Sequence, residues 1–168
     1  MLINNSSLED IETIFKLYRS AVDYQKAKGY NLWPEFEQKL IEQEINEKRL
    51  WKITEAEEIA CIFSVAYTDP IIWDENDADP AIYLHRITTN PLFKGKGMMQ
   101  LIIDWSKEHA KQNNKKSIRM DTWGDNDNLK KYYTNCGFTY LRQKHFPGKN
   151  ELPAHYWGNT LSLFEIKL

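Results

Sequence analysis

The feature that most constrains this chain is a glycine-rich turn between a predicted strand and a predicted helix. Residues Ala81–Thr89 have the β-branched and aromatic content of a strand. A turn with the sequence Lys-Gly-Lys-Gly follows at residues 94–97, and apolar side chains then recur at helical spacing at Met98, Leu101, Ile102 and Trp105. A strand, a glycine turn and a helix in this order predict a sheet that is covered by helices.

This turn has the chemistry of an anion site. A helix N-terminus presents unpaired backbone N–H groups and the positive end of the helix dipole, and glycines let a ligand approach the backbone closely. Lys94 and Lys96 add positive charge. The turn matches neither the G-x-x-x-x-G-K-[ST] loop for nucleoside triphosphates nor the G-x-G-x-x-G dinucleotide fingerprint. Taken alone, it leaves a phosphate site and an ordinary basic turn open.

The pattern of helices and strands continues along the chain. Ser6 or Ser7 with Glu9 offers a capping box for a helix over residues 8–22, and Trp33-Pro34 suits the start of a helix over residues 33–45. The sequence then predicts strands over residues 50–54, 59–68, 81–89, 117–122, 138–144 and 156–166, a loop over 69–79, and helices from residue 98 and over 125–135. No internal repeat or linker interrupts this order. We therefore expect an α/β fold in one domain over residues 1–168, with a central mixed β-sheet flanked by helices.

Composition narrows the classes of partner and the compartment. Among 168 residues, 22 Lys and Arg nearly balance 24 Asp and Glu, so the net charge gives no reason to expect a nucleic-acid or membrane partner. Cys61 and Cys136 form neither a disulfide framework nor a zinc spacing, which predicts a reducing compartment. No apolar run reaches the roughly 18 to 20 residues of a membrane span. We expect a cytoplasmic protein, and a homodimer is compatible with this composition.

Two short motifs resemble the GNAT N-acetyltransferase superfamily. The family opens its helix with [QR]-x-x-G-x-[GA], which residues 94–99 approach: Lys94 stands for Arg or Gln, Gly97 is the central glycine, and Met99 departs from Gly or Ala. A second family motif, an Asn with a Tyr seven residues later and then a Gly-Phe pair, is met by Asn126, Tyr133, Gly137 and Phe138. The resemblance implies a GNAT-like acyl-CoA N-acyltransferase fold and a single N-acetyltransferase domain.

The same resemblance implies acetyl-CoA as the acyl donor. Its pyrophosphate would lie on residues 94–99, its pantetheine and acyl carbonyl on the backbone of residues 87–89, and its thiol end near the second motif. The residues implied to bind it are Ile87, Thr88, Thr89, Lys94, Gly95, Lys96, Gly97, Met98, Met99, Asn126 and Tyr133. The resemblance implies no metal ion.

Direct acyl transfer to an amine requires two proton movements. The departing thiolate gains a proton, and the resemblance implies Tyr133 as its donor, with Tyr132 as the rival and helix packing as the alternative for both. The attacking amine, whose ammonium form has a pKa of about 10, must lose a proton. His85 is the candidate base because imidazole titrates near neutrality and two-residue alternation places it on one strand face with Tyr83 and Ile87. A packed or solvent-facing histidine is the alternative.

The sequence says least about the acceptor. We expect a small molecule with a primary amine, or alternatively a peptide, that enters beside the first two helices and the loop over residues 69–79. Acidic side chains gather in these segments at Glu35, Glu37, Asp74, Glu75, Asp77 and Asp79. Three tryptophans offer either core packing or an aromatic floor for a cation: Trp33, Trp73 and Trp123.

Other functions stay open at this level. A catalytically silent module that binds acyl-CoA would keep the turn without turnover, and a different binding domain would use the turn only as structure. Three aspartates lack the spacing of a calcium loop and favour helix capping instead: Asp121, Asp125 and Asp127.

Overall fold

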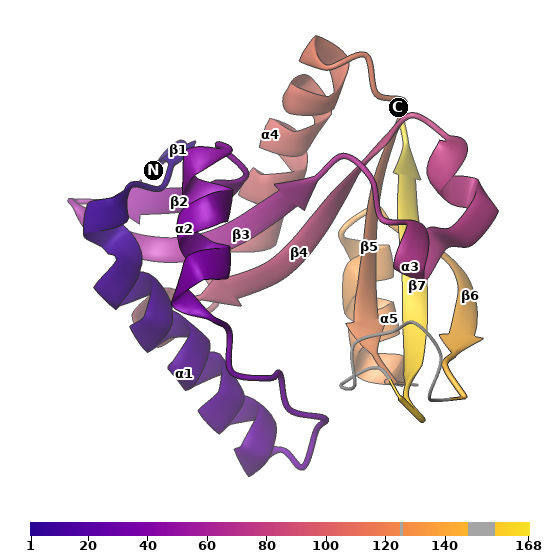
Figure 1. Cartoon of the computed structure of the whole chain (residues 1–168), viewed down its shortest axis with the longest axis horizontal. Helices are drawn as coiled ribbons and strands as arrows, with labels where there is room; N and C mark the ends of the chain where they lie inside the picture. The colour runs from indigo at the N-terminus through magenta and orange to yellow at the C-terminus, as the bar shows by residue number, and fades with distance from the viewer. Residues whose placement is uncertain (125, 148–156) are drawn as a thin grey trace. The chain divides into compact units, whose positions relative to one another are not determined.

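The computed structural model describes residues 1–124, 126–147 and 157–168 (Figure 1). The elements in chain order are β1 (Leu2–Asn5), η1 (Leu8–Asp10), α1 (Ile11–Ala27), α2 (Gln38–Asn46), β2 (Leu50–Glu55), β3 (Glu58–Ala66), α3 (Pro70–Trp73), η2 (Asp74–Ala78), β4 (Ala81–Thr89), η3 (Pro91–Phe93), α4 (Met98–Gln112), β5 (Ser117–Trp123), α5 (Asp127–Asn135), β6 (Thr139–His145) and β7 (Thr160–Lys167).

The strands of the described residues form a mixed sheet. They are hydrogen-bonded in the order β1-β2-β3-β4-β5-β7-β6. β4 and β5 run parallel, with Ala81 opposite Ser117 and Leu84 opposite Met120, whereas β1–β2, β2–β3, β5–β7 and β6–β7 are antiparallel pairs. Because parallel strands need a long crossover, α4 supplies the connection from β4 to β5. The predicted α/β fold with a mixed sheet and flanking helices is confirmed.

The chain forms two compact units. Unit 1 comprises residues 1–65 and 85–98, and unit 2 comprises residues 66–84 and 99–168. β4 therefore gives its first half to unit 2 and its second half to unit 1. The expectation of one domain over residues 1–168 stays a prediction.

Unit 1 is built on an apolar core between two helices and a hairpin. The buried residues of this core are Ile14, Leu17 and Tyr18 of α1, Ile41 and Ile45 of α2, Leu50 of β2, and Ile59 and Ile62 of β3. β2 and β3 are joined by a two-residue turn in which Ala56 and Glu57 both have positive φ, at 48° and 69°. This geometry matches the twist of an antiparallel hairpin. The strands predicted at residues 50–54 and 59–68 are therefore paired as an antiparallel hairpin.

Unit 2 has its own core beside β5 and β7. Its buried residues are Ile72, Trp73, Ala81, Tyr83, Phe146, Leu161 and Leu163, with Trp123 packed against them. Arg119 is buried here because its guanidinium pairs with Glu165 at 2.9 Å and with Asp79 at 2.8 Å, and lies 4.7 Å from the centre of the Trp73 ring. Opposite charges and an aromatic face together compensate the burial of this cation.

The second helix begins later than Trp33-Pro34 predicts. α2 starts at Gln38, and Glu37 before it is extended, with a ψ of 138°. The Trp33 ring lies 6.2 Å from that of Tyr18 and 5.9 Å from that of Phe36, so aromatic packing holds residues 33–37 outside the helix. The prediction of a helix from residue 33 was wrong because tertiary packing overrode a local proline signal.

Three other predictions about the elements need correction. The segment 69–79 is not a plain loop, because Pro70 begins the four-residue helix α3 and η2 follows it. The strand β1 was missed: only alternate residues of its four are half-buried, too few for a visible pattern. β7 begins at Thr160, and the predicted start at Tyr156 lies outside the described residues.

The first and fifth helices differ from prediction at their starts. The capping box at the beginning of the chain uses Ser7 and Asp10 rather than Glu9, since the Ser7 N–H donates to the Asp10 carboxylate at 2.7 Å. α5 begins at Asp127 with Asn126 as its cap, and Asp125 lies outside the described residues. Within the residues that the structure describes, no helix combines the length and the apolar character needed to cross a membrane.

Candidate functional site

In the glycine turn of unit 1, backbone conformation dictates two of the residues. Gly95 has a φ of +82° and Gly97 a φ of +73°, which is the left-handed region that favours glycine. A Cβ built on either residue would meet no atom within 4 Å. Both glycines therefore face open space, so a ligand can approach the backbone directly at this turn.

The turn is anchored to the neighbouring strand β3. The backbone N–H of Asn90 donates to the Ala60 carbonyl at 2.9 Å, and its side-chain amide donates to the Ile59 carbonyl at 3.0 Å. The side-chain oxygen of Asn90 also accepts a hydrogen bond from the Leu92 N–H at 3.1 Å. These bonds fix the start of the turn, and α4 begins one residue after Gly97. A rigid glycine turn before a fifteen-residue helix fits a diphosphate, because the first N–H groups of the helix have no partner within it.

The two lysines of the turn are engaged differently. The Lys96 ammonium pairs with Glu55 at 2.7 Å and lies 4.6 Å from the centre of the Phe93 ring. The Lys94 ammonium lies over the ring of Tyr24 in α1, 5.3 Å from its centre. Since Glu55 partly neutralises Lys96, the stronger positive charge of the turn lies on the Lys94 side.

The methionines that follow the turn are turned inward. Met98 and Met99 are both buried, each with 5% of its surface exposed. The long side chain at the position where the family motif has Gly or Ala therefore lies in the interior rather than on the exposed surface of the turn.

The second half of β4 contains an irregular residue. Arg86 has a φ of +48°, a conformation that a side-chain-bearing residue adopts at a cost of about 1 to 2 kcal/mol. The Thr88 hydroxyl donates to the Arg86 carbonyl at 3.1 Å and closes this bend. A left-handed residue interrupts the two-residue alternation of a strand. The expectation that His85 shares a face with Ile87 by regular alternation therefore loses its basis.

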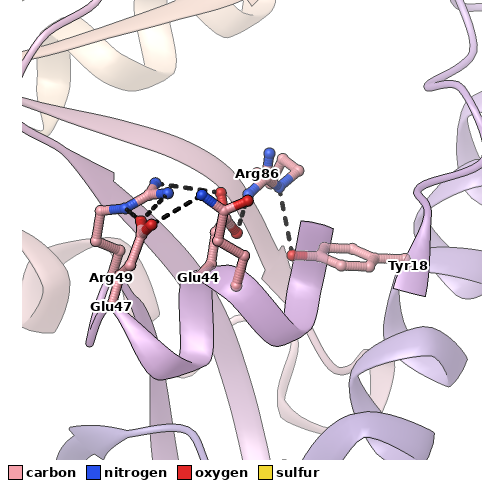
Figure 2. Close-up of polar contacts among 6 residues, drawn as sticks. Tyr18, Glu44, Glu47, Arg49 and Arg86 are labelled. Carbon is pink, nitrogen blue, oxygen red and sulfur yellow. Dashed lines mark hydrogen bonds and ion pairs between the residues drawn. The ribbon is translucent and has the colours of Figure 1, made fainter. Parts of the chain in front are cut away.

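Two helices of unit 1 hold the Arg86 side chain (Figure 2). Its guanidinium forms an ion pair with Glu44 of α2 and donates to the Tyr18 hydroxyl of α1 at 3.4 Å. Glu44 also lies 3.4 Å from Arg49, which pairs in turn with Glu47. Because the Glu44 side chain is only 5% exposed, its two arginine neighbours supply the charge that its burial requires. The irregular residue next to Ile87–Thr89 is thus held by a part-buried ion pair, for which the sequence offers no periodic signal.

His85 precedes this residue and is half-buried. Burial, together with the positive charges of Arg86 and Arg49, lowers the pKa of the imidazole to about 4. His85 is therefore neutral at neutral pH.

In unit 2, α5 carries the residues of the second motif. The side-chain oxygen of Asn126 caps this helix by accepting a hydrogen bond from the Leu129 N–H at 3.1 Å. Tyr133 is half-buried, with its ring centre 5.5 Å from that of Phe164 and 6.2 Å from that of Phe138. Tyr132 is 50% exposed and touches Tyr133 edge-on. Of the two tyrosines, Tyr133 is the one fixed by packing.

Two carboxyl groups of unit 2 have unusual titration. Burial, together with the nearby carboxylate of Asp69, raises the pKa of Asp121 to about 7. Burial and then the charge of Asp77 raise the pKa of Asp69 to about 6. The two carboxyl groups lie within 4.8 Å of each other. From the sequence, Asp121 was considered only as a calcium ligand or a helix cap, and Asp69 was not considered. The signal for Asp121 was its place as an acid within the apolar strand at residues 117–122, because a buried carboxyl group has a shifted pKa.

The other acidic residues before β4 have partners within unit 2. Asp74 pairs with Lys144, Asp79 pairs with Arg119, and Asp77 accepts a hydrogen bond from the Asp69 N–H. The side chain of Glu75 lies outside the described part of the chain. These pairs reduce the negative field that the sequence suggests for residues 69–79.

Unit 1 instead has an acidic groove between α1 and residues 35–38. The groove has a volume of about 660 Å³. Its lining residues are Ile11, Glu12, Phe15, Arg19, Glu35, Phe36, Glu37 and Gln38. Glu12 pairs with Lys16 at 2.7 Å, which leaves the carboxylates of Glu35 and Glu37 against one guanidinium. Two aromatic rings lie among them, so the groove favours a cation. Of the three tryptophans named from the sequence, Trp33 packs against the core of unit 1, and Trp73 and Trp123 pack in the core of unit 2.

The fold and the turn define a class: an α/β protein in which a glycine turn between parallel strands leads into a helix. Comparison with known sequences gives the family. The sequence model of the Acetyltransferase (GNAT) family matches residues 20–138, and the chain belongs to this family. A curated relative, the uncharacterized N-acetyltransferase YesJ of Bacillus subtilis, is 23% identical over 141 residues, which cover 79% of this chain and 78% of that protein.

Solved structures share the fold over nearly the whole chain. A GNAT-family acetyltransferase from Listeria monocytogenes is similar with a TM-score of 0.77 and 24% identity, covering 99% of this chain and 94% of that one. The structure of yncA from Salmonella typhimurium, which contains its cofactor acetyl-CoA, is similar with a TM-score of 0.70 and 14% identity over 99% of this chain and 93% of that one. At these identities the likeness establishes the fold.

Proposed function

We propose that this protein transfers an acetyl group from acetyl-CoA to the primary amine of a small molecule by direct attack. The observation that carries the proposal is the anchored glycine turn, with left-handed Gly95 and Gly97 facing open space directly before α4. A diphosphate is the group that such a turn recognises best. Membership of the GNAT family and the acetyl-CoA in a similar structure support the choice of donor.

Each part of the proposed donor site has a separate task. Acetyl-CoA supplies a thioester carbonyl that is open to attack by an amine. The turn over residues 94–99 holds the pyrophosphate through backbone N–H groups and Lys94. Backbone N–H groups of Ile87–Thr89 hold the pantetheine and stabilise negative charge on the carbonyl oxygen. The irregular φ of Arg86 supports this assignment, because strained backbone gathers at functional sites.

The proton donor to the leaving sulfur is Tyr133. A thiolate with a pKa of about 8.5 leaves more easily when a hydroxyl group donates a proton to it. The ring contacts with Phe138 and Phe164 support Tyr133 over the exposed Tyr132, because a fixed side chain loses less freedom when it acts.

The proton of the amine has two candidate acceptors. His85, the base proposed from the sequence, is neutral above pH of about 4, but its conjugate acid is far stronger than an ammonium group with a pKa of about 10. Asp121, with a pKa of about 7, is better matched to that transfer. The pH dependence of kcat/KM separates the two. If kcat/KM shows no titration of the base above pH 5, the proton goes to His85. If kcat/KM rises through pH 7 and this rise disappears in Asp121→Asn, the proton goes to Asp121.

The acidic groove of unit 1 supports a cationic amine as the acceptor. Glu35 and Glu37 attract an ammonium group, and Phe15 and Phe36 offer apolar contacts to its carbon chain. Diamines and polyamines fit this combination better than neutral or anionic acceptors. The prediction of a small molecule rather than a peptide rests on the limited volume of about 660 Å³.

A panel of amines with acetyl-CoA tests the proposal. We expect thiol release together with a mass increase of the acceptor by one acetyl group, fastest for acceptors with two or more positive charges. Charge reversal at Glu35 should slow cationic acceptors, whereas Glu58→Lys in the β2–β3 turn region serves as a surface control outside the groove. Binding of acetyl-CoA without turnover of any amine would identify a silent acyl-CoA-binding module, and absence of binding would make the turn purely structural.

A further inference from the structure

A second feature beside the glycine turn is an exposed aromatic pair with converging lysines. Tyr24 lies in the last turns of α1 and is 49% exposed, and Tyr30 is 43% exposed. Their ring centres are 6.5 Å apart at an angle of 69°. Large aromatic side chains on a surface present flat apolar area that solvent does not stabilise, so a ligand with a planar ring gains by covering them.

Helix termination sets the position of Tyr30. Gly29 has a φ of +67°, and the Tyr30 N–H returns to the Gln25 carbonyl at 2.9 Å. The Gly29 N–H also reaches the Lys26 carbonyl at 3.1 Å. This is a helix C-cap in which a left-handed glycine reverses the direction of the chain. The aromatic pair is therefore preformed by backbone hydrogen bonds rather than by side-chain packing alone.

Two lysines converge on the ring of Tyr24. The ammonium groups of Lys94 and Lys28 lie 5.3 Å and 5.9 Å from the ring centre. Neither forms an ion pair with any residue in the ranges 1–124, 126–147 and 157–168, in contrast to Lys96, which pairs with Glu55. Two like charges near one ring repel each other, and an anion between them removes this repulsion.

Lys94 connects this pair of rings to the proposed diphosphate site. It is the first residue of the glycine turn and at the same time a neighbour of Tyr24. In coenzyme A, the diphosphate carries the adenosine 3′-phosphate on one side and the pantetheine on the other. Since the backbone of Ile87–Thr89 is assigned to the pantetheine, the adenosine 3′-phosphate extends from the turn toward a different surface.

We propose that Tyr24, Tyr30, Lys28 and Lys94 bind the adenosine 3′-phosphate end of the acyl donor. This inference rests on the proposed function and adds to it the residues that recognise the nucleotide. The adenine stacks on an exposed tyrosine ring, as bases do on aromatic side chains. The Lys28 ammonium holds the 3′-phosphate, and the Lys94 ammonium is shared between this phosphate and the pyrophosphate. The same positive charge disfavours the cationic acceptor, which keeps the two substrates on different surfaces of unit 1.

Comparison of CoA with 3′-dephospho-CoA tests the assignment. Calorimetric titration should show that wild-type protein binds CoA at least tenfold more tightly than 3′-dephospho-CoA, because the 3′-phosphate forms charge-assisted hydrogen bonds with the ammonium groups. Lys28→Ala should weaken the binding of CoA roughly tenfold and leave that of 3′-dephospho-CoA unchanged, which reduces the ratio between them. The matched control is Lys26→Ala, which removes another exposed lysine of the same helix end and should change neither affinity.

The aromatic part has its own variants. Tyr24→Ala should weaken both CoA and 3′-dephospho-CoA, and Tyr24→Phe should restore both, because stacking needs the ring and not the hydroxyl. Since Tyr24 is half-exposed, neither variant removes a core contact. If wild-type protein binds CoA but Lys28→Ala leaves the ratio of the affinities for CoA and 3′-dephospho-CoA unchanged, this inference is overturned while the proposed function stands. Wild-type protein that does not bind CoA would overturn both.

Discussion

Gly97 shows how a single residue joins backbone conformation to ligand binding. Its φ of +73° strains any side-chain-bearing residue by about 1 to 2 kcal/mol, although a Cβ would meet no protein atom. We expect Gly97→Ala to lower the free energy of unfolding by that amount and to weaken CoA at least tenfold, because the new methyl group occupies the space of a phosphate. Urea denaturation and calorimetric titration measure the two effects.

Gly158 provides the matched control for this variant. It has a φ of +69°, and a Cβ built there also meets nothing within 4 Å. Gly158→Ala should therefore lose similar stability without any change in the affinity for CoA. Equal weakening of CoA by both variants would mean that strain alone, and not the space at Gly97, determines binding.

Tyr133 is the second residue with a separable role. Tyr133→Phe keeps the ring contacts with Phe138 and Phe164 and removes only the hydroxyl group. We expect kcat to fall roughly 100-fold with little change in the binding of acetyl-CoA, because a leaving-group acid acts in the transition state. Tyr132→Phe, on the exposed neighbour, should leave kcat within twofold. The reverse result in steady-state kinetics would assign the proton to Tyr132.

The sequence predicted positions in the site better than conformations. The positions in the turn and in the second motif could be named because residue type and spacing carry that signal. The left-handed φ of Arg86 could not be predicted, because arginine rarely adopts this conformation. The contacts that hold Arg86 are with Glu44 and Tyr18, which are distant in sequence. The depressed pKa of His85 follows from burial and from two arginines, one of them 36 residues away in sequence.

At the scale of elements, the contact between α2 and β4 is the clearest case of tertiary stabilisation in unit 1. Glu44→Ala leaves Arg86 buried without its carboxylate, and we expect a loss of about 3 to 5 kcal/mol in the free energy of unfolding. Glu47→Ala removes a 44% exposed carboxylate that pairs only with Arg49 in the described ion pairs, so it should lose at most about 1 kcal/mol. Urea denaturation of the two variants gives the comparison, and equal losses would contradict a special role for Glu44.

Elements with a strong period were predictable, and short ones were not. β3, β4, α4 and β5 appear within a few residues of their predicted positions because long apolar patterns dominate local choice. β1 and α3 have four residues each, which is too short for a period to show. The late start of α2 follows from the packing of Trp33 and Phe36 against Tyr18, which lies in a separate helix, α1.

At the scale of the whole molecule, Asp121 links stability to pH. Its folded-state pKa of about 7 lies above the ordinary value of 3.8, so the folded protein binds the proton more tightly than the unfolded chain. The resulting stabilisation is complete below pH of about 3.8 and is lost as the pH rises through about 7. We expect Asp121→Asn to raise the melting temperature relative to wild type at pH 8 and to lose this advantage at pH 5, as measured by thermal denaturation. A stabilisation that is independent of pH would contradict the assignment.

The close approach of Asp69 and Asp121 was beyond reach of the sequence. One residue precedes α3 and the other lies in β5, 52 positions further along the chain. Their proximity depends on how residues 66–84 fold against β5, and neither composition nor periodicity specifies that arrangement. The family motifs could therefore nominate residues for a donor site, which stays a prediction, whereas the groups that titrate near neutral pH required the structure.

The interleaving of the two units has a consequence for how the protein is made. A ribosome completes residues 1–65 first, but unit 1 also needs residues 85–98, which emerge only after the first segment of unit 2. Until Asn90 has been synthesised, the carbonyls of Ile59 and Ala60 in β3 lack the hydrogen bonds that this residue donates. A nascent chain paused near Val65 therefore exposes an unfinished strand edge to chaperones and to other nascent chains, and synthesis of the glycine turn is what ends this exposure.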